Sequence, residues 1–302
     1  MSTRLSGVLL VALSATCFAA MPVFARTMYA DGGDPSTLLL LRFVLAAGLL
    51  LLLAVRRAAR PTGATLVGLV LLGALYVCQS LAYFTALTMT AASLLGLLLY
   101  VYPVVVALLA SMLFHIALTR ARIASLAVAL AGAALTIGPV GDGNWLGIGL
   151  GMASALIYAG YILIATRLTR SVDPVWSSAI ITASAASIFG ALALARGVAL
   201  PMSSIGWAAV GAIALISTVV AILSFLAGLT RVGPTDAATL STLEPAMTAL
   251  LAVVLLGESL APVQIVGGAL IVSAALIVAR ADTPIVPLAP SSSARSTSHR
   301  AA

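Results

Sequence analysis

The sequence of 302 residues is 62% hydrophobic and only 8% charged, with a mean hydropathy of +1.21. This composition excludes a water-soluble globular domain and predicts an all-α polytopic membrane protein, because apolar stretches of about 20 residues recur roughly ten times. The net charge of +7 comes from arginines in short loops beside apolar segments, a placement that sets orientation in a membrane and does not indicate a nucleic-acid partner.

The first two predicted helices cover residues 4–26 and 36–55. The first is similar to a secretory signal, but its apolar run continues to Ala25 and its pattern recurs from Gly147, so we expect a retained helix. The second carries Arg42 inside the span, roughly two turns from its outer end. The Arg42 guanidinium could bind a substrate carboxylate, extend to the membrane interface or form a structural ion pair.

The third predicted helix, residues 64–87, places Tyr76, Gln79 and Tyr83 on one face through spacings of three and four. That face should point into the bundle, because a glutamine amide facing lipid would lack hydrogen-bond partners. Two interpretations remain open. Gln79 could bond a neighbouring helix while the tyrosines fill the core, or the three side chains could line a cavity for an organic solute.

The fourth predicted helix opens near Thr90 and contains Tyr100, two residues before Tyr102-Pro103. A proline at this depth predicts a break that frees backbone carbonyl groups toward a cavity. We therefore expect Tyr100 to line the same cavity. A fifth helix follows at residues 123–137.

The second half of the sequence repeats the first. Tyr76 and Tyr83 correspond to Thr218 and Phe225, and Pro103-Val-Val-Val-Ala-Leu-Leu-Ala corresponds to Pro245-Ala-Met-Thr-Ala-Leu-Leu-Ala, at one constant spacing. This duplication predicts a first five-helix repeat over residues 1–140 and a second over 141–281. Because each repeat has an odd number of helices, the two should be inverted in the membrane, an arrangement that permits alternating access. We expect Tyr158 and Phe225 to be the second repeat's contribution to the cavity.

Glu244-Pro245 is the acidic feature of the second repeat, since Tyr102 stands at the position equivalent to Glu244. Pro245 predicts a second helix break. A carboxylate near mid-depth could carry a proton or meet a cationic group of a substrate. Alternatively, Glu244 could be a structural residue beside the break, and we favour this conformational role.

Two stretches resemble a known family. LEPAMTALLAVVLLGESL followed by APVQIVGGALIV resembles the closing helix pair of the drug/metabolite transporter superfamily, EamA type, and the Arg-Phe dipeptide in LLLLRFVLAAGLLLLLA is also usual there. The resemblance covers nearly everything before the tail. It implies a ten-helix permease that exports metabolites, amino acids or related compounds.

The sequence thus predicts a secondary transporter for a small organic solute in the plasma (inner) membrane, with no cofactor and no metal site. Placing both termini in the cytoplasm leaves every arginine except Arg26, Arg42 and Arg196 on the cytoplasmic side. An enzyme is not expected, because HExxH and paired intramembrane aspartates are absent from the sequence. A non-transporting membrane partner remains the alternative, and the oligomeric state is open. Residues 282–302, rich in Pro, Ser and Ala, are expected to form a disordered cytoplasmic tail.

Overall fold

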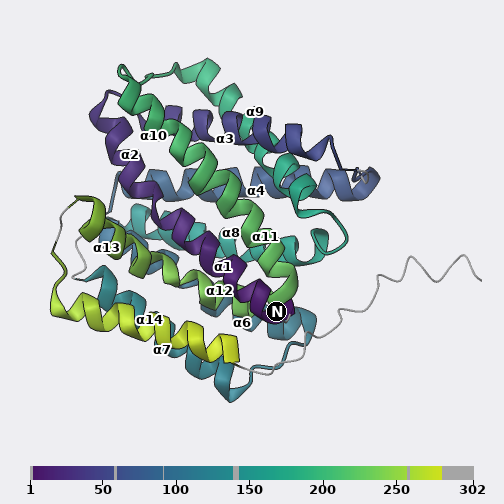
Figure 1. Cartoon of the computed structure of the whole chain (residues 1–302), viewed down its shortest axis with the longest axis vertical. Helices are drawn as coiled ribbons and strands as arrows, with labels where there is room; N and C mark the ends of the chain where they lie inside the picture. The colour runs from purple at the N-terminus through teal and green to yellow at the C-terminus, as the bar shows by residue number, and fades with distance from the viewer. Residues whose placement is uncertain (1–2, 58–59, 91, 139–142, 257–258, 281–302) are drawn as a thin grey trace, which may run out of the picture.

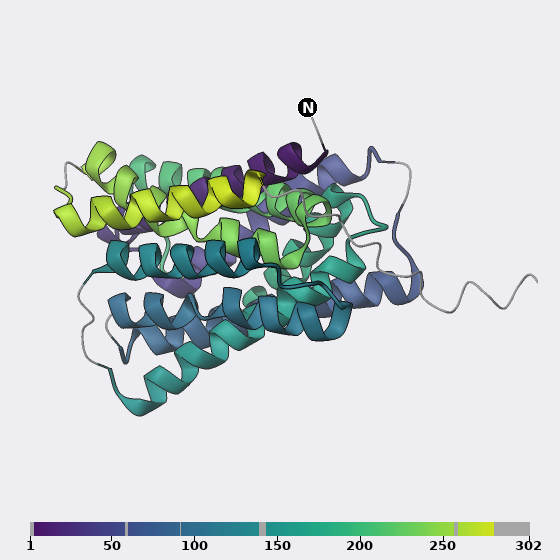
Figure 2. The ribbon, with the colours of Figure 1, turned by 90° about the horizontal axis from the view of Figure 1, so that it is seen from below.

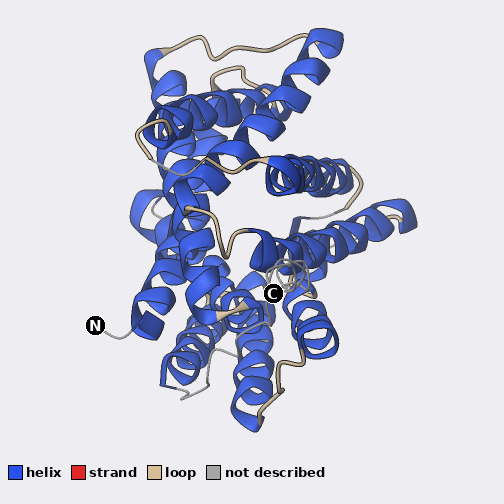
Figure 3. Cartoon of the chain, turned by 90° about the vertical axis from the view of Figure 1, so that its right-hand side faces the viewer, coloured by secondary structure: helices blue, strands red, loops and turns tan. Residues whose placement is uncertain are grey.

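The computed structural model describes residues 3–57, 60–90, 92–138, 143–256 and 259–280. Within these ranges every regular element is a helix and no strand occurs (Figure 3). The first half of the chain forms α1 (Thr3–Ala19), α2 (Met21–Ala30), α3 (Pro35–Ala54), α4 (Gly63–Leu87), α5 (Ala92–Leu99), α6 (Tyr102–Phe114) and α7 (Arg120–Ile137). The second half forms α8 (Trp145–Leu168), α9 (Pro174–Arg196), α10 (Ser204–Ala214), the π-helix η1 (Leu215–Val220), α11 (Ala221–Val232), α12 (Pro234–Ser241), α13 (Leu243–Leu256) and α14 (Pro262–Arg280). The predicted tail lies outside the described residues.

These helices give ten apolar segments, as the sequence predicted. Nine segments of the described chain are long and apolar enough to cross a membrane. The remaining one is divided between α12 and α13 and supplies the tenth crossing. Large apolar side chains face outward along the bundle, including Leu71 at 63% and Met112 at 72% exposure. A lipid-facing surface accounts for this exposure, which a water-soluble protein of this size would not tolerate.

Several crossings of the described chain are interrupted. The first crossing is broken at Ala20, between α1 and α2. The fourth is broken at residues 100–101, between α5 and α6, and the ninth at Thr242, between α12 and α13. A proline lies within the first turn of the helix that follows each break, at Pro22, Pro103 and Pro245, where its missing N–H costs no intrahelical bond. The break at Ala20 was not expected from the sequence, and neither was the π-helix η1.

The two halves pack against each other through corresponding helices. The most extensive contacts join α3 to α9, α7 to α14, α1 to α11 and α4 to α8. When each helix is replaced by its equivalent in the other half, the pairs α3–α9 and α7–α14 stay the same. The pairs α1–α11 and α4–α8 change into each other. In Figure 1, α7 and α14 run together at one edge of the bundle, and α1 lies beside α11 near its middle. The packing therefore follows the repeat in the sequence.

Glycines allow the closest of these approaches. A Cβ added to Gly267 of α14 would lie 2.5 Å from Thr136 Oγ1 and 2.7 Å from the Gly132 carbonyl oxygen of α7. A side chain at Gly132 would meet the Gly267 carbonyl oxygen at 2.7 Å. Small residues let the backbones of membrane helices come together in this way.

One end of the bundle gathers the arginines, and we call it the arginine-rich end. Arg4 at the start of α1 donates to the Val278 carbonyl near the end of α14 (2.8 Å), and Figure 2 shows the beginning of the chain and the end of α14 on the same side. Arg57, after α3, lies 3.9 Å from Asp173, which precedes α9. The Arg167 guanidinium of α8 lies 4.6 Å from the centre of the Phe114 ring at the end of α6.

The opposite end is held by hydrogen bonds to two carboxylates. Asp31 accepts from the Ser203 N–H at 2.7 Å, and this backbone hydrogen bond holds the pKa of Asp31 below its ordinary value. Asp34 caps α3 by accepting from the N–H groups of Ser36 (2.7 Å) and Thr37 (3.0 Å), and it accepts from Ala199 N–H at 3.2 Å. Burial opposes ionisation of Asp34, but these hydrogen bonds outweigh it and lower its pKa.

Candidate functional site

A continuous row of aromatic rings crosses the interior of the bundle. Neighbouring rings have centroids between 4.7 and 6.4 Å apart, in stacked, tilted or edge-to-face arrangements. We call it the aromatic row, and in order it consists of Phe189, Phe43, Tyr76, Tyr161, Tyr158, Tyr102 and Tyr100. It draws on α9, α3, α4, α8 and α6 and on the break before α6, so it joins both halves of the chain.

The row brings together three of the predicted site residues. Tyr76 contacts Tyr161 at 5.5 Å, Tyr158 meets Tyr102 edge to face at 4.7 Å, and Tyr100 lies 6.4 Å from Tyr102. Tyr100 is buried, whereas Tyr76 and Tyr158 are half-buried. Tyr83 is outside the row and pairs with Phe84 at 5.5 Å.

Glu244 lies in the broken crossing of α12 and α13, which approaches this row. It is the second residue of α13, directly after the break at Thr242, and α12 packs against α6, the helix that carries Tyr102. Its carboxylate is close enough to interact electrostatically with the hydroxyl groups of four tyrosines: Tyr83, Tyr100, Tyr102 and Tyr158. Glu244 is half-buried and makes no salt bridge within the described part of the chain. The arrangement is a carboxylate within electrostatic range of several tyrosine hydroxyl groups.

Gln79 joins two helices of different halves. Its Nε2 donates to Ser154 Oγ of α8 at 3.0 Å, and Ser154 Oγ donates back to the Gln79 carbonyl oxygen at 3.3 Å. Ser80 Oγ lies 3.4 Å from Gln79 Oε1. The interhelical bond that the sequence offered as one interpretation is therefore present.

Arg42 is 3% exposed, so its guanidinium does not extend to the interface. Nη1 lies 2.9 Å from the Met21 sulfur, and the guanidinium carbon lies 4.6 Å from the centre of the Phe43 ring, the second ring of the aromatic row. Nε and Nη2 have no hydrogen-bond partner, and Arg42 has no ion pair among the described residues. An arginine buried in this way is costly unless water or a ligand supplies acceptors for these two nitrogen atoms.

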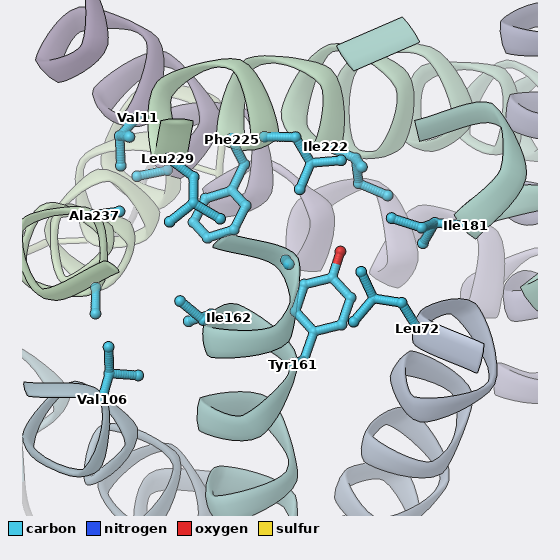
Figure 4. Close-up of a cluster of buried hydrophobic side chains, with 14 of the residues drawn as sticks. Val11, Leu72, Val106, Tyr161, Ile162, Ile181, Ile222, Phe225, Leu229 and Ala237 are labelled. Carbon is cyan, nitrogen blue, oxygen red and sulfur yellow. The ribbon is translucent and has the colours of Figure 1, made fainter. Parts of the chain in front are cut away.

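Phe225 is 4% exposed and belongs to the main hydrophobic core. Figure 4 shows its ring pointing from α11 toward α8, among Leu229, Ile222 and Ile162. It makes no aromatic pair with the row within the described residues. Phe225 nevertheless shares this hydrophobic core with Tyr100, Tyr102 and Tyr161 of the aromatic row.

A cavity of about 330 Å³ lies toward the opposite end, between α3, α4 and α9. Its polar lining residues are Ser36, Thr85 and Thr88, and the rest of the wall is apolar. Phe84 and Phe189 belong to this wall, so the cavity adjoins the first ring of the aromatic row. None of its lining residues was predicted as a site residue.

Sequence reasoning missed Tyr102, Tyr161 and Ser154 as site residues. Tyr161 follows Tyr158 by three positions, so the helical spacing that drew attention to α4 could also have found this pair in α8. Ser154 could have been found only with the knowledge that α4 packs against α8. Within the described residues, no group of three His, Cys, Asp or Glu side chains could hold a metal ion.

The chain was compared with known proteins and structures. The profile of the EamA-like transporter family matches residues 5–138 and again residues 145–280. A relative from Bacillus subtilis (strain 168), named Uncharacterized transporter YcbK, is 27% identical over 284 residues, which are 87% of this chain and 89% of the relative. A solved structure described only as a crystal structure of a protein superposes with a TM-score of 0.79 at 22% identity, covering 91% of this chain and 98% of its own, and this likeness concerns the fold alone.

Proposed function

The chain belongs to the EamA-like transporter family and is a multi-pass membrane transporter, and from this premise we propose that it exports a small organic solute, an amino acid or related metabolite, across the plasma (inner) membrane. The proposed mechanism is alternating access by a secondary transporter, in which two repeats, residues 1–140 and 141–281, rock about a central site. The observation that carries the proposal is that the broken crossing of Glu244 packs, through α12, against α6, whose Tyr102 belongs to the aromatic row.

Orientation follows from the distribution of charge. The arginine-rich end is assigned to the cytoplasm, because positively charged loops are retained on that side of the membrane. Both termini are then cytoplasmic, and the opposite end, with Asp31 and Asp34, faces outward. The exposed apolar side chains between the two ends support direct contact with the lipid bilayer.

The site residues divide by the part of the solute that each would meet. Arg42, with two free donors, would receive a carboxylate or another anionic group. Tyr76, Tyr83, Tyr100 and Tyr158 would cover the organic part, with hydroxyl groups available for hydrogen bonds. Gln79 would fix the position of α4 against α8, and Phe225 would support the site from the core.

Glu244 has the role that most affects mechanism. A carboxylate without a fixed cation can take up a proton or a substrate ammonium group, and either event would change its interaction with the surrounding tyrosines. Its position after the break at Thr242 would pass that change to the angle between α12 and α13. Proton coupling is therefore part of the proposal. No other cofactor is included.

The test is a thermal-shift screen of the purified protein against amino acids, nucleosides, sugars and cationic compounds, followed by counterflow in proteoliposomes with any compound that stabilises it. A ligand that binds the folded protein raises its stability by mass action. We expect one compound class to stabilise the wild type and to exchange across the membrane. Stabilisation without exchange, or no stabilisation by any class, would contradict the proposal and favour a non-transporting membrane partner.

Glu244→Gln is the matched variant, because it keeps the size and the polar character of the side chain and removes its charge and its titration. We expect this variant to fold and to lose the pH dependence of solute exchange. A variant that exchanges solute with the pH dependence of the wild type would exclude proton coupling through Glu244.

A further inference from the structure

A buried carboxylate at the arginine-rich end binds two arginines. Asp236, the third residue of α12, is 2% exposed. Its Oδ2 accepts from Arg4 Nη2 at 2.9 Å, and its Oδ1 accepts from Arg122 Nε at 3.0 Å. We call these three residues the ion triad. Charge-assisted bonds in a place shielded from water are among the strongest that side chains make.

The ion triad ties together segments that are far apart in the sequence. Arg4 lies in α1, Arg122 in α7 and Asp236 in α12, and Arg4 also donates to the Val278 carbonyl of α14. Arg122 Nη1 bonds the Ala117 carbonyl oxygen at 3.0 Å, which holds the loop before α7 in place. Two of the four helices belong to each half of the chain. Any motion that opens this end between the halves must therefore break bonds to Asp236.

The repeat provides an internal comparison at the opposite end. α5 begins at Ala92 as α12 begins at Pro234, so Leu94 is the equivalent of Asp236. Gln264, the third residue of α14, is the equivalent of Arg122 in α7, and Asn144 corresponds to Arg4. Gln264 Nε2 donates to the Thr136 carbonyl oxygen at 3.1 Å, and Asn144 accepts from Gly147 N–H at 2.7 Å. These equivalents are all uncharged, so the ion triad has no counterpart at their positions.

The helices that carry these equivalent residues also pack differently at the two ends. At the arginine-rich end α12 packs against α6 and α7, both from the other half. The equivalent contacts would join α5 to α13 and α14, and among the described residues no comparable packing is present there. The contacts that α5 does make, with α8, α7 and α4, have their equivalents in those of α12 with α1, α14 and α11. The contacts of α12 with α6 and α7 thus close the halves together beside the ion triad, whereas at the opposite end the halves are joined by the bonds of Ser203 N–H to Asp31 and of Ala199 N–H to Asp34.

We infer that Asp236 is a positioning residue for transport: by binding Arg4 and Arg122 it holds the arginine-rich end closed and makes the conformation open at the opposite end the resting one. The inference rests on the proposed alternating access, which requires both ends to open in turn. A preference built into one end shifts the equilibrium between the two conformations without touching the solute.

The test uses one reporter cysteine at each end, in a background with Cys17→Ala and Cys78→Ala. Thr235→Cys reports on the arginine-rich end, because Thr235 is 3% exposed and adjacent to Asp236. Leu94→Cys reports on the equivalent position at the opposite end. Purified protein in nanodiscs, open to solvent on both faces, is reacted with a water-soluble maleimide, and the alkylation rate of each reporter is measured.

Asp236→Asn should raise the alkylation rate of the Thr235→Cys reporter at least tenfold and lower that of the Leu94→Cys reporter. Arg122→Gln, which removes one partner and keeps the carboxylate, should change both rates in the same directions. Asp31→Asn, which weakens a bond between the halves at the opposite end, should not raise the Thr235→Cys rate, because it favours the conformation in which the arginine-rich end is closed.

Two results would overturn the inference. An unchanged Thr235→Cys rate in both triad variants would show that the ion triad does not hold this end closed. An increase of the alkylation rate at both reporters would show a general loosening of the protein, which is expected if Asp236 only stabilises the fold. The readout needs no solute, so opposite changes at the two ends in a protein that exchanges no solute would refute the proposed transport and leave the closure established.

Discussion

The Tyr102 and Tyr158 rings meet edge to face with centroids 4.7 Å apart, and this contact joins α6 to α8. Tyr102 is the first residue of α6, directly after the break at residues 100–101. Tyr158 also stacks on Tyr161 at 5.9 Å. A single ring therefore connects the segment beside Glu244 with the rest of the aromatic row.

Tyr158→Phe should keep both ring contacts and leave the apparent unfolding temperature in detergent nearly unchanged. Tyr158→Ala removes both contacts, and we expect the free energy of unfolding to fall by at least about 1–3 kcal/mol, because each aromatic pair is worth about 0.5–1.5 kcal/mol in addition to the burial of the ring. Solute-dependent stabilisation should persist in the phenylalanine variant and disappear in the alanine variant. If both variants lose it equally, the hydroxyl group and not the ring is what binding requires.

Arg42→Met should stabilise the protein while abolishing binding of anionic solutes. The guanidinium is buried with two donors unpaired, and replacing such a charge by an apolar side chain of similar length removes a desolvation cost on the order of 1 kcal/mol or more. Thermal denaturation with and without solute measures both effects. A lower unfolding temperature would show that Arg42 contributes to the fold, contrary to the proposed role.

Gly267→Ala should weaken the contact between α7 and α14. The added methyl group would lie 2.5 Å from Thr136 Oγ1 and 2.7 Å from the Gly132 carbonyl oxygen, so the helices must separate, at a cost of about 1–3 kcal/mol. Gly160→Ala in α8 is the matched control, since nothing lies within 4 Å of its added methyl group. That variant should unfold at or above the wild-type temperature, because alanine favours a helix by about 1 kcal/mol over glycine.

Asp34→Ala should lower stability by about 1–2 kcal/mol through loss of the cap on α3 and of the bond to Ala199 N–H. The pKa of Asp34 is depressed in the folded protein. Its contribution is therefore fully present above the unfolded-state pKa of about 3.9 and is lost as the pH falls through the lower folded pKa. Unfolding temperatures of wild type and variant should differ at pH 6 and approach each other near pH 2. A constant difference would assign the effect to packing.

The number of crossings and the duplication could be predicted from the sequence, because both depend on the length and order of apolar segments. The break at Ala20 and the π-helix at residues 215–220 could not. Pro22 lies in a segment that reads as a continuous apolar helix, and the wide turn of η1, in which Thr218 Oγ1 bonds the Ile213 carbonyl oxygen at 2.9 Å, leaves no mark in hydrophobic periodicity.

Some residues of interest could likewise be predicted from the sequence, and others could not. Spacing on one helix predicted Tyr76, Gln79 and Tyr83 as site residues; the structure places Tyr76 in the aromatic row and Gln79 at the contact with α8, whereas Tyr83 pairs with Phe84 outside the row. Asp236 was missed because its partners Arg4 and Arg122 are distant in the chain, and their approach depends on how α1, α7 and α12 pack. Phe225 was assigned by its equivalence to Tyr83, but the two positions have different surroundings, since Phe225 lies in the packed core.

The burial of Arg42 also concerns how the protein is made. A newly synthesised helix must partition from the translocon into lipid before its neighbours are present, and an arginine near its centre opposes this step by about 2.5–3.5 kcal/mol. Leucine runs at residues 38–41 and 49–53 flank Arg42 in α3, and each leucine favours insertion by about 0.3–0.6 kcal/mol. The leucines thus let this segment enter the bilayer alone, so that the arginine can be delivered to its interior position during biogenesis.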